Sequence, residues 1–253
     1  MGGSLGLALR RAGWRVAGVD RDGAAVDRAL ELGAIDEAGP GGADVLVLAV
    51  PVLAIRAVLG QAPPGALVTD LCSTKVEVLR WAAEAGVELV GGHPLCGSER
   101  SGIEAARADL YDGAPWALTR PDPVVEEMVV AAGARPLIVE AEEHDRLVAG
   151  GSHVAFLISA AYMLATETAA DWPAMAALTA SGFRDMTRLS GGDPAMYEGI
   201  VSTNAANILA RLDEFETALA RLRLNLEGHH ERLAELLAEA REARRRWEES
   251  RAR

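Results

Sequence analysis

The sequence predicts an α/β domain in the first half of the chain and an all-helical domain in the second half. Short apolar, partly β-branched runs alternate with segments of helical spacing over residues 14–139. The run at residues 44–50 (DVLVLAV) is apolar almost without interruption, which is typical of a parallel strand covered on both faces. Beyond residue 142 the β signals vanish. This alternation followed by helices indicates a doubly wound α/β domain joined to a helical one.

The elements of the first half follow in a regular order. A helix over residues 5–11 opens the chain, and a helix over residues 24–32 stops at Gly33, since glycine readily ends helices. A further helix is expected to end near residue 85, and another spans residues 123–132. Strands are expected at residues 14–19, 44–50, 66–69, 87–90, 116–119 and 136–139.

The second half is predicted to be helical throughout. A long apolar helix runs from His144 to about residue 170, and shorter helices cover residues 173–181 and 182–189. Asp193 is expected to cap a long helix that starts at Pro194 and ends near residue 226.

The chain is expected to divide after residues 141 and 228, into segments 1–141, 142–228 and 229–253. The last segment is a charged helix, for which a solvated face or a frayed tail is the simplest interpretation. The middle segment is apolar and all-helical, and such a domain usually buries itself against another surface. A homodimer is the economical expectation.

Composition and charge narrow the range of partners. The 253 residues carry a net charge of −12, which argues against nucleic acid or an anionic membrane surface as partner. No apolar run reaches membrane-spanning length, and residues 1–9 lack the basic start of a signal peptide. Two cysteines, Cys72 and Cys96, form no paired framework, so a reducing cytoplasm fits. The sequence predicts no metal site.

The most informative segment is the stretch GGHPLCGSE at residues 91–99, which follows the apolar run at residues 87–90. In an open α/β sheet, ligands bind at the loops beyond the carboxyl ends of the strands. His93 is therefore expected in a glycine-rich loop where it can transfer a proton near neutral pH. The alternative is a histidine that only satisfies a loop hydrogen bond.

The first residues carry part of a dinucleotide-binding turn. Gly2, Gly3 and Ser4 open a helix directly, whereas a dinucleotide-binding domain places a strand and a glycine-rich turn before that helix. We therefore expect the first, central strand to be missing from this sheet, with weaker nucleotide binding and lower stability as the consequence. Asp20 ends the following strand, where a carboxylate can bond the ribose hydroxyls. The alternatives are a flexible terminus and an ordinary turn residue.

Read together, the motifs resemble the prephenate/arogenate dehydrogenase family of tyrosine biosynthesis, up to about residue 226. The His93 segment and the stretch at residues 182–197 are the specific ones. The motifs that carry the resemblance are GGSLG at 2–6, VDRD at 19–22, LAVP at 48–51, TDLCSTK at 69–75, GGHPLCGSERSGIE at 91–104, GAPW at 113–116, EEHD at 142–145, SH at 152–153 and GFRDMTRLSGGDPAMY at 182–197.

The resemblance implies a Rossmann-like dinucleotide-binding domain (1–141), a helical substrate and dimerisation domain (142–228) and a charged tail. It implies oxidative decarboxylation of prephenate, or of arogenate, with hydride transfer to NAD or NADP. His93 matches the catalytic histidine, and Ser73 matches a serine that bonds this histidine or the substrate hydroxyl. The implied substrate-binding residues are Arg188, His153, Glu99 and Asp145. The implied cofactor-binding residues are Gly2, Gly3, Ser4, Asp20, Arg21, Val50 and Pro51.

The chemistry of these residue types agrees with those roles. A dianionic substrate needs a fixed cation, and the planar fork of an arginine such as Arg188 holds a carboxylate with two hydrogen bonds. The alternatives are a surface ion pair for Arg188, a helix N-cap for Ser73 and a packed helix histidine for His153. Asp20 favours NAD over NADP, because a carboxylate repels the 2′-phosphate, while Arg21 softens that preference.

The chain departs from the resemblance at two further positions. Phe156 stands where many members carry another histidine, and Tyr197 stands at a position that is often tryptophan. Substrate preference and feedback by tyrosine therefore stay open. Two competing interpretations are a β-hydroxyacid-type dehydrogenase and a dimeric protein of the same fold with impaired nucleotide binding. The histidine motif disfavours the first of these, since those enzymes use a lysine base.

Overall fold

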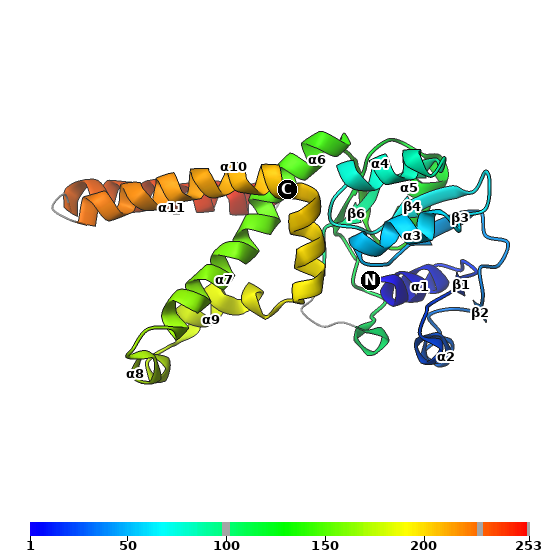
Figure 1. Ribbon diagram of the computed structural model, residues 1–253, viewed down its shortest axis with the longest axis horizontal. Coiled ribbons are helices and arrows are strands. Elements are labelled where there is room, and N and C mark those ends of the chain that lie inside the picture. Colours follow the sequence, from blue (N-terminus) through cyan, green and yellow to red (C-terminus); the bar gives the residue numbers. More distant parts are fainter. Residues whose placement is uncertain (98–101, 227–229, 252–253) are drawn as a thin grey trace. The chain divides into compact units, whose positions relative to one another are not determined.

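The computed structural model describes residues 1–97, 102–226 and 230–251. The chain forms two compact units, Met1–Ala205 and Ala206–Arg253. The first unit contains the strands and most of the helices (Figure 1). Its strands are β1 (Ala17–Gly18), β2 (Glu37–Ala38), β3 (Val45–Leu48), β4 (Leu67–Asp70), β5 (Leu89–Val90), β6 (Gly92–Pro94), β7 (Pro115–Leu118) and β8 (Arg135–Ile138). Its first helices are α1 (Gly2–Arg11), α2 (Gly23–Glu31), α3 (Ile55–Leu59), α4 (Val76–Glu84) and α5 (Pro123–Ala131).

The alternation of strands and helices expected from the sequence is confirmed, and the strands form three small sheets. Strands β3, β4 and β5 are parallel, with Val47 opposite Thr69 and Thr69 opposite Val90. Strand β7 pairs in parallel with β8 and antiparallel with β6. Strands β1 and β2 form a separate parallel pair, so β1 and β3 do not share a sheet.

The expectation that His93 lies in a loop is wrong. His93 is the middle residue of β6 and pairs with Ala117 of β7. This strand has only three residues, Gly92-His93-Pro94, and its partner lies more than twenty residues further along the chain. A glycine and a proline on either side of one histidine hide a strand from any local pattern.

Two large apolar cores, and a smaller one around Ala34 and Ile35, hold the α/β part together. Helices α1 and α5 enclose one large core, in which Leu5 packs with Trp116 and Val125. Helices α3 and α4 enclose the other large core, in which Ile55 packs with Val78. All of these residues are buried. Each helix thus covers the strands with the apolar face that its sequence pattern predicts.

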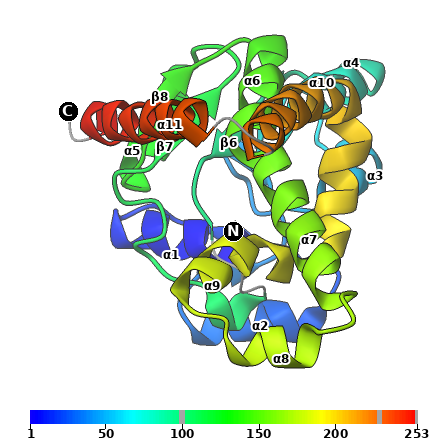
Figure 2. The same ribbon diagram turned by 90° about the vertical axis from the view of Figure 1, so that its left-hand side faces the viewer.

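The rest of the first unit is helical. Helix α6 (Ala141–Val148) passes through a π-helical turn, Ala149–His153, into α7 (Val154–Glu167). Helices α8 (Trp172–Ala177) and α9 (Ser181–Thr187) follow α7, and α9 packs against it (Figures 1 and 2). A 3₁₀ turn, η4 (Arg188–Gly191), then leads to α10 (Pro194–Leu226). The backbone amide of Ala195 donates to the Asp193 carboxylate, as expected of a cap.

The continuous helical stretch Ala141–Glu167 is long and apolar enough to cross a membrane by length and composition, contrary to the expectation that no segment reaches that length. The mean hydropathy of its most apolar window is 1.6, and 33% of that window is buried. The difference arises because the charged start of α6 and the apolar α7 join into one helix. The η4 turn and α9 both pack on α7, which accounts for part of this apolar surface.

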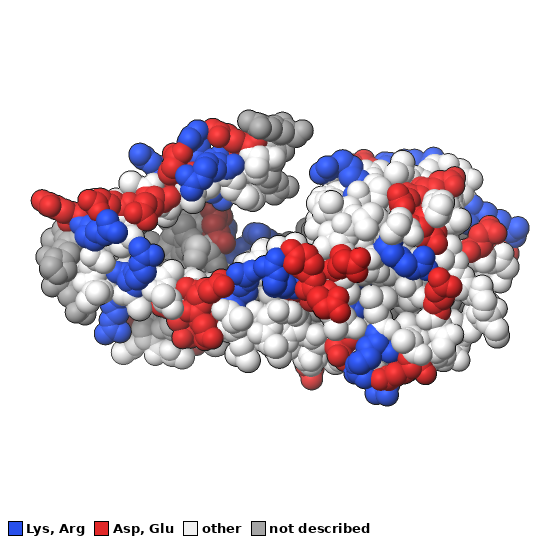
Figure 3. Space-filling model, turned by 90° about the horizontal axis from the view of Figure 1, so that it is seen from above, with Lys and Arg blue, Asp and Glu red and all other residues white. Residues whose placement is uncertain are grey.

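The second unit consists of the rest of α10 and helix α11 (His230–Arg251). Ion pairs between residues three or four apart line α11, such as Arg244 with Glu248 and Arg245 with Glu249. Exposed pairs of this kind contribute only a few tenths of a kcal/mol each. Figure 3 shows the mixture of acidic and basic side chains on one face of the molecule.

Candidate active site

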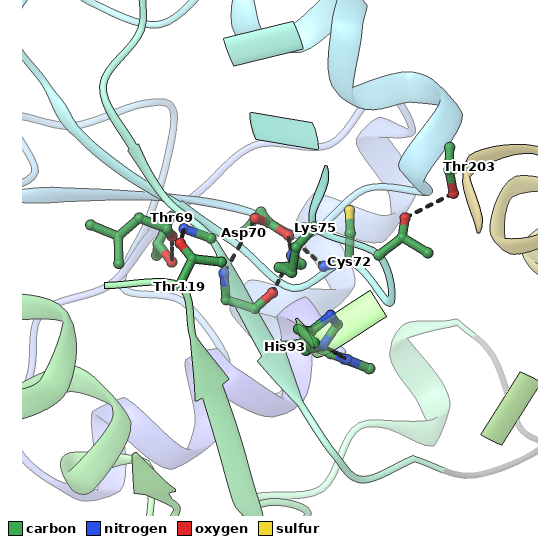
Figure 4. Close-up of polar contacts among 12 residues, drawn as sticks. Thr69, Asp70, Cys72, Lys75, His93, Thr119 and Thr203 are labelled. Atoms are coloured by element: carbon green, nitrogen blue, oxygen red, sulfur yellow. Dashed lines mark hydrogen bonds and ion pairs between the residues drawn. The ribbon is translucent and has the colours of Figure 1, made fainter. Parts of the chain in front are cut away.

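The backbone around His93 is fixed by a buried ion pair. Lys75 and Asp70 are both fully buried and bonded to each other, and the Lys75 ammonium also donates to the carbonyl of Gly92 at 2.5 Å. The Asp70 carboxylate accepts from the amides of Cys72 at 2.7 Å and Gly92 at 3.3 Å. Figure 4 shows this pair beside His93. Removing either partner would leave a buried charge, so the pair ties the loop after β4 to β6.

Gly92 permits this close contact between β4 and β6. A Cβ atom at Gly92 would lie 2.4 Å from the carbonyl oxygen of Asp70, a backbone atom that cannot yield. The neighbouring Gly91 donates its amide to the Thr119 hydroxyl at 2.9 Å. The glycines before His93 therefore serve close backbone packing, which sets the histidine at a fixed point at the end of the sheet.

His93 begins a chain of hydrogen bonds that the sequence analysis did not predict. Its Nδ1 lies 2.9 Å from Nε2 of His144, and the two rings meet edge to face. Nδ1 of His144 lies 2.8 Å from Oδ1 of Asp145. His144 and Asp145 are buried, while His93 is partly accessible. The accessible histidine is thus backed by a buried histidine and a buried carboxylate.

Asp145 also caps helix α4 from a distant part of the chain. Its two oxygens accept from the amides of Lys75 at 2.8 Å and Val76 at 3.0 Å. A carboxylate at a helix N-terminus satisfies free amides and interacts favourably with the helix dipole. The sequence left an N-cap by Ser73 as an alternative, but the cap comes from Asp145.

The environment of His93 keeps its imidazole neutral. Burial lowers the pKa of His93 well below its ordinary value, and the nearby positive charge of Lys75 lowers it further, followed by the effects of His144 and His153. An imidazole with a lowered pKa is unprotonated at neutral pH, so it has a lone pair with which to accept a proton.

His153 lies at the end of the π-helical turn, in contact with Asn204. Nδ2 of Asn204 donates to the carbonyl of Asp145 at 2.8 Å and lies 3.2 Å from Nδ1 of His153. Asn204 has a non-helical backbone conformation inside α10, where the helix kinks. Nε2 of His153 is buried and has no hydrogen-bond partner among the described residues. Burial lowers the pKa of His153 to about 4.

Ser73 lies in the loop between β4 and α4 and is half-buried. No hydrogen bond of its side chain, to His93 or to another residue, is found in the described part of the chain. Its neighbour Thr74 shares a hydrogen bond of 2.8 Å with the hydroxyl of Thr203 (Figure 4). This contact and the cap by Asp145 hold the Ser73 loop against the helical segment.

Arg188 is exposed at the start of η4, close enough to Tyr197 for its charge to lower that phenol's pKa, which burial raises. Tyr197 stacks on Phe156 of α7, so the two departures from the family resemblance are in direct contact. The Ser159 hydroxyl accepts from the amide of Ser190 at 3.1 Å, which fixes η4 on α7. Glu99 lies outside the described residues.

The residues expected to hold a cofactor occupy three segments, at the start of α1, after β1 and after β3. The first hydrogen bond of α1 runs from the amide of Leu5 to the carbonyl of Met1, so the amides of Gly2, Gly3 and Ser4 precede the helical ladder. Among the described residues, no side chain caps this end. The buried Ser4 hydroxyl accepts from the Arg107 amide at 3.1 Å and thus has a structural contact as well.

The second cofactor segment follows β1. Asp20 and Arg21 are exposed, and Oδ1 of Asp20 accepts from the amide of Asp22, which itself caps α2. Asp20 therefore forms a turn, and its other carboxylate oxygen has no hydrogen-bond partner among the described residues. Val50 and Pro51 follow β3, and the carbonyl of Val50 accepts from the Cys72 thiol at 3.7 Å.

A helix N-terminus without a side-chain cap and an exposed carboxylate at the end of the next strand fit the pyrophosphate and ribose of a dinucleotide. The first turn of α1 contains no acidic residue. Among residues 1–97, 102–226 and 230–251, no group of three histidine, cysteine or acidic residues is arranged to hold a metal ion.

His144, Asn204 and the ion pair of Lys75 with Asp70 were not predicted from the sequence. A signal existed for His144, because it precedes Asp145 in the EEHD motif. Asn204 is a polar residue among apolar neighbours of a long helix, which is a weaker signal. The Lys75–Asp70 pair gave none, because charged residues beside a strand end usually face solvent.

An α/β fold of this topology, with a neutral histidine at the end of its sheet and helices packed beside it, fits the class of nucleotide-dependent dehydrogenases. Comparison with known proteins identifies the family. Residues 5–130 match the family model of the prephenate dehydrogenase nucleotide-binding domain, and residues 140–239 match that of the prephenate dehydrogenase dimerization domain.

Individual relatives agree with the family models. A probable prephenate dehydrogenase of Streptomyces niveus, NovF, is 34% identical over 246 residues, which cover 90% of this chain and 67% of that protein. The structure of prephenate dehydrogenase from A. aeolicus in complex with hydroxyphenyl propionate and NAD+ is 26% identical with a TM-score of 0.89, covering 96% of this chain and 93% of that one. Synechocystis arogenate dehydrogenase is 27% identical with a TM-score of 0.80, covering 97% and 95%. The chain belongs to the prephenate dehydrogenase family.

Proposed function

We propose that this protein oxidises and decarboxylates prephenate to 4-hydroxyphenylpyruvate, with arogenate as the alternative substrate. The single observation that carries the proposal is the neutral His93, held at the end of the sheet by β6 and backed by His144 and Asp145. Membership of the prephenate dehydrogenase family supports the choice of reaction.

His93 acts on the ring hydroxyl of the substrate. It accepts the hydroxyl proton as the hydride leaves the same carbon, so that positive charge does not build up on the oxygen. The ring carboxylate then departs as carbon dioxide, and its bonding electrons complete the aromatic ring. The proton returns to the ring oxygen, so the phenol product keeps its hydroxyl and the charges balance. Ser73, in the loop next to β6, is the second candidate to contact that hydroxyl or His93.

The helical segment provides the substrate-binding groups. Arg188 is proposed to hold a carboxylate of the dianionic substrate, since its guanidinium can form two parallel hydrogen bonds. His153 is proposed to contact the substrate through Nε2, the buried atom without a partner in the described structure. Asp145 reaches the substrate site through His144, and Glu99 stays a candidate from the sequence alone.

The cofactor proposed is NAD, with NADP as the alternative. The amides of Gly2, Gly3 and Ser4 would hold the pyrophosphate, Asp20 and Arg21 would meet the ribose, and Val50 and Pro51 would lie beside the dinucleotide. When bound, the nicotinamide supplies the hydride acceptor. The A. aeolicus relative, whose structure contains NAD+, supports this choice.

We further propose a homodimer in the cytoplasm. The match to a dimerization domain supports a dimer, and so do large apolar side chains exposed on this segment, such as Leu164 at 64% and Leu178 at 86%. Free Cys72 and Cys96 are consistent with a reducing compartment. The division of the chain after residues 141 and 228 stays a prediction.

The test is an assay of reduced-cofactor formation with purified protein. Prephenate and arogenate are each supplied with NAD and with NADP, and carbon dioxide release is followed in parallel. We expect reduced cofactor and carbon dioxide in equal amounts, with prephenate and NAD as the best pair. Neither product from any pair, in a protein shown by calorimetry to bind NAD, would overturn the proposal. Absence of NAD binding would instead favour a protein of this fold with impaired nucleotide binding.

A further inference from the structure

We infer that Asp145 and His144 are positioning residues that fix His93 in the tautomer with a proton on Nδ1 and a free lone pair on Nε2. This inference rests on the proposed function for its catalytic consequence, although the tautomer itself can be observed without catalysis. It follows from which atom must donate and which must accept in each hydrogen bond that links Asp145, His144 and His93.

The direction is set at Asp145. Its Oδ1 accepts from the backbone amide of Lys75 and its Oδ2 accepts from that of Val76, and a backbone amide can only donate. Both oxygens therefore present lone pairs. Nδ1 of His144, 2.8 Å from Oδ1, must be the donor of the third hydrogen bond.

The same direction passes through His144 to His93. A neutral imidazole carries one proton, so a His144 that is protonated on Nδ1 has an acceptor at Nε2. That Nε2 lies 2.9 Å from Nδ1 of His93, which must then donate. The single proton of a neutral His93 is used in this bond. Its Nε2 is left as the lone pair that can take a proton from the substrate.

The opposite arrangement would be costly. A proton on Nε2 of His93 would turn its Nδ1 into an acceptor facing the acceptor of His144. Moving the proton of His144 to Nε2 as well would place its unprotonated Nδ1 against the carboxylate of Asp145. Each such mismatch leaves a polar group in this buried site without its hydrogen bond, which is unfavourable. The direction that starts from the two backbone amides at Asp145 is therefore the one in which every hydrogen bond has a donor and an acceptor.

The hydrogen-bond chain also links the base to the loop that carries Ser73. Asp145 holds the start of α4 through Lys75 and Val76, and Lys75 in turn holds Gly92, the residue before His93. The side chain of His93 and its backbone thus depend on the same helix start. A substitution of Asp145 would disturb both the side chain and the backbone of His93. A substitution of His144 changes only the hydrogen bond to the side chain and is therefore the better test.

The test compares three variants with the wild-type protein. His144→Phe keeps a planar ring but removes donor and acceptor. His144→Gln keeps both, because one amide oxygen can accept from His93 while the amide nitrogen donates to Asp145. Val129→Ala, a truncation in the core between α5 and the sheet, controls for loss of stability alone. Asp145 is left unchanged because it caps α4.

The first readout is ¹⁵N NMR of histidine-labelled protein, which distinguishes protonated from unprotonated ring nitrogens. The chain has only five histidines, so the His93 signals can be assigned by comparison with a His93 variant. We expect His93 to carry its proton on Nδ1 in the wild-type, His144→Gln and Val129→Ala proteins. In His144→Phe we expect a mixture of the two tautomers.

The second readout is kinetic. We expect His144→Phe to lower kcat by about 10²-fold, the lower end of the range for removing a general base, with the KM for NAD unchanged. His144→Gln should restore most of that loss. Nδ1 protonation of His93 in His144→Phe, or an unchanged kcat, would overturn the inference. An inactive wild-type protein with the expected tautomer would contradict the proposed reaction but not the tautomer assignment.

Discussion

Two histidine sites of the first unit, His93 and His153, differ in what surrounds the ring. His93 lies on a strand of the α/β part, where β7, the Lys75–Asp70 pair and His144 fix its backbone and one ring nitrogen. His153 lies at the end of a π-helical turn in the helical part, where Asn204 contacts one ring nitrogen and the other has no partner in the described structure. Several elements hold His93, whereas Nε2 of His153 is left without a hydrogen-bond partner among the described residues.

The two histidines therefore differ in whether the free ring nitrogen accepts or donates a hydrogen bond. His93 donates through Nδ1 and presents an acceptor. The amide group of Asn204 donates to the carbonyl of Asp145, so it is also a donor toward Nδ1 of His153. A neutral His153 must then carry its proton on Nε2 and present a donor, which suits a substrate oxygen. These two arrangements support the proposal that the α/β part transfers the proton and the helical part binds the substrate.

The largest effect should come from removing the base. We expect His93→Asn to lower kcat by about 10²–10⁴-fold, the usual range for a general base, while NAD binding stays as in the wild-type protein. Stopped-flow measurement of a single turnover and calorimetric titration with NAD give the two quantities. Wild-type turnover in this variant would show that the α/β part does not supply the base.

Arg188→Ala should have the next largest effect and should act on binding. We expect it to weaken the substrate's transition-state binding by about 2–4 kcal/mol, seen chiefly as a higher KM, because a desolvated carboxylate loses its partner. Arg184→Ala, on the preceding turn, is the matched control with an exposed arginine. Equal effects of the two substitutions on KM would show that Arg188 is an ordinary surface charge.

The sequence predicted the α/β part more fully than the site. Strands such as β3 and β7 lie within two residues of their expected places, because apolar runs between turn residues are local signals. Strand β6 was missed because its pairing, not its composition, makes it a strand. His144 and Asn204 each contact residues 51 positions away, and no local pattern encodes such contacts. The candidate residues were therefore found by resemblance, while their hydrogen-bond partners required the structure.

The buried His153 should also make stability depend on pH. Its pKa is about 4 in the folded protein and 6.5 in the unfolded chain, so below pH 6.5 the unfolded state binds a proton that the folded state does not. The free energy of unfolding should fall by about 1.4 kcal/mol from this group between pH 7.5 and 5.5. The loss begins as pH falls through 6.5 and is complete near pH 4.

Urea denaturation of the wild-type protein and of His153→Gln at both pH values measures this contribution. The wild-type protein should lose more stability than the variant over the interval, because His93 contributes with the same sign to both proteins. Parallel losses in the two proteins would show that His153 takes up its proton in the folded state. The helical site would then accept a protonated imidazole as readily as water does.

The smallest effect concerns the cofactor segment after β1. This segment is exposed, whereas His153 is buried. We expect the ratio of kcat/KM for NAD to that for NADP to exceed one and to fall about tenfold in Asp20→Asn, because the variant loses the charge that repels a 2′-phosphate. Asparagine can still accept from the amide of Asp22, so the turn is kept. Asp22→Asn makes the same change of charge two residues away and can still cap α2, so it should leave the ratio unchanged.

Faster turnover of the wild-type protein with NADP, or equal effects of the two substitutions, would mean that Asp20 only forms the turn. Cofactor preference would then have to come from Arg21 or from another segment.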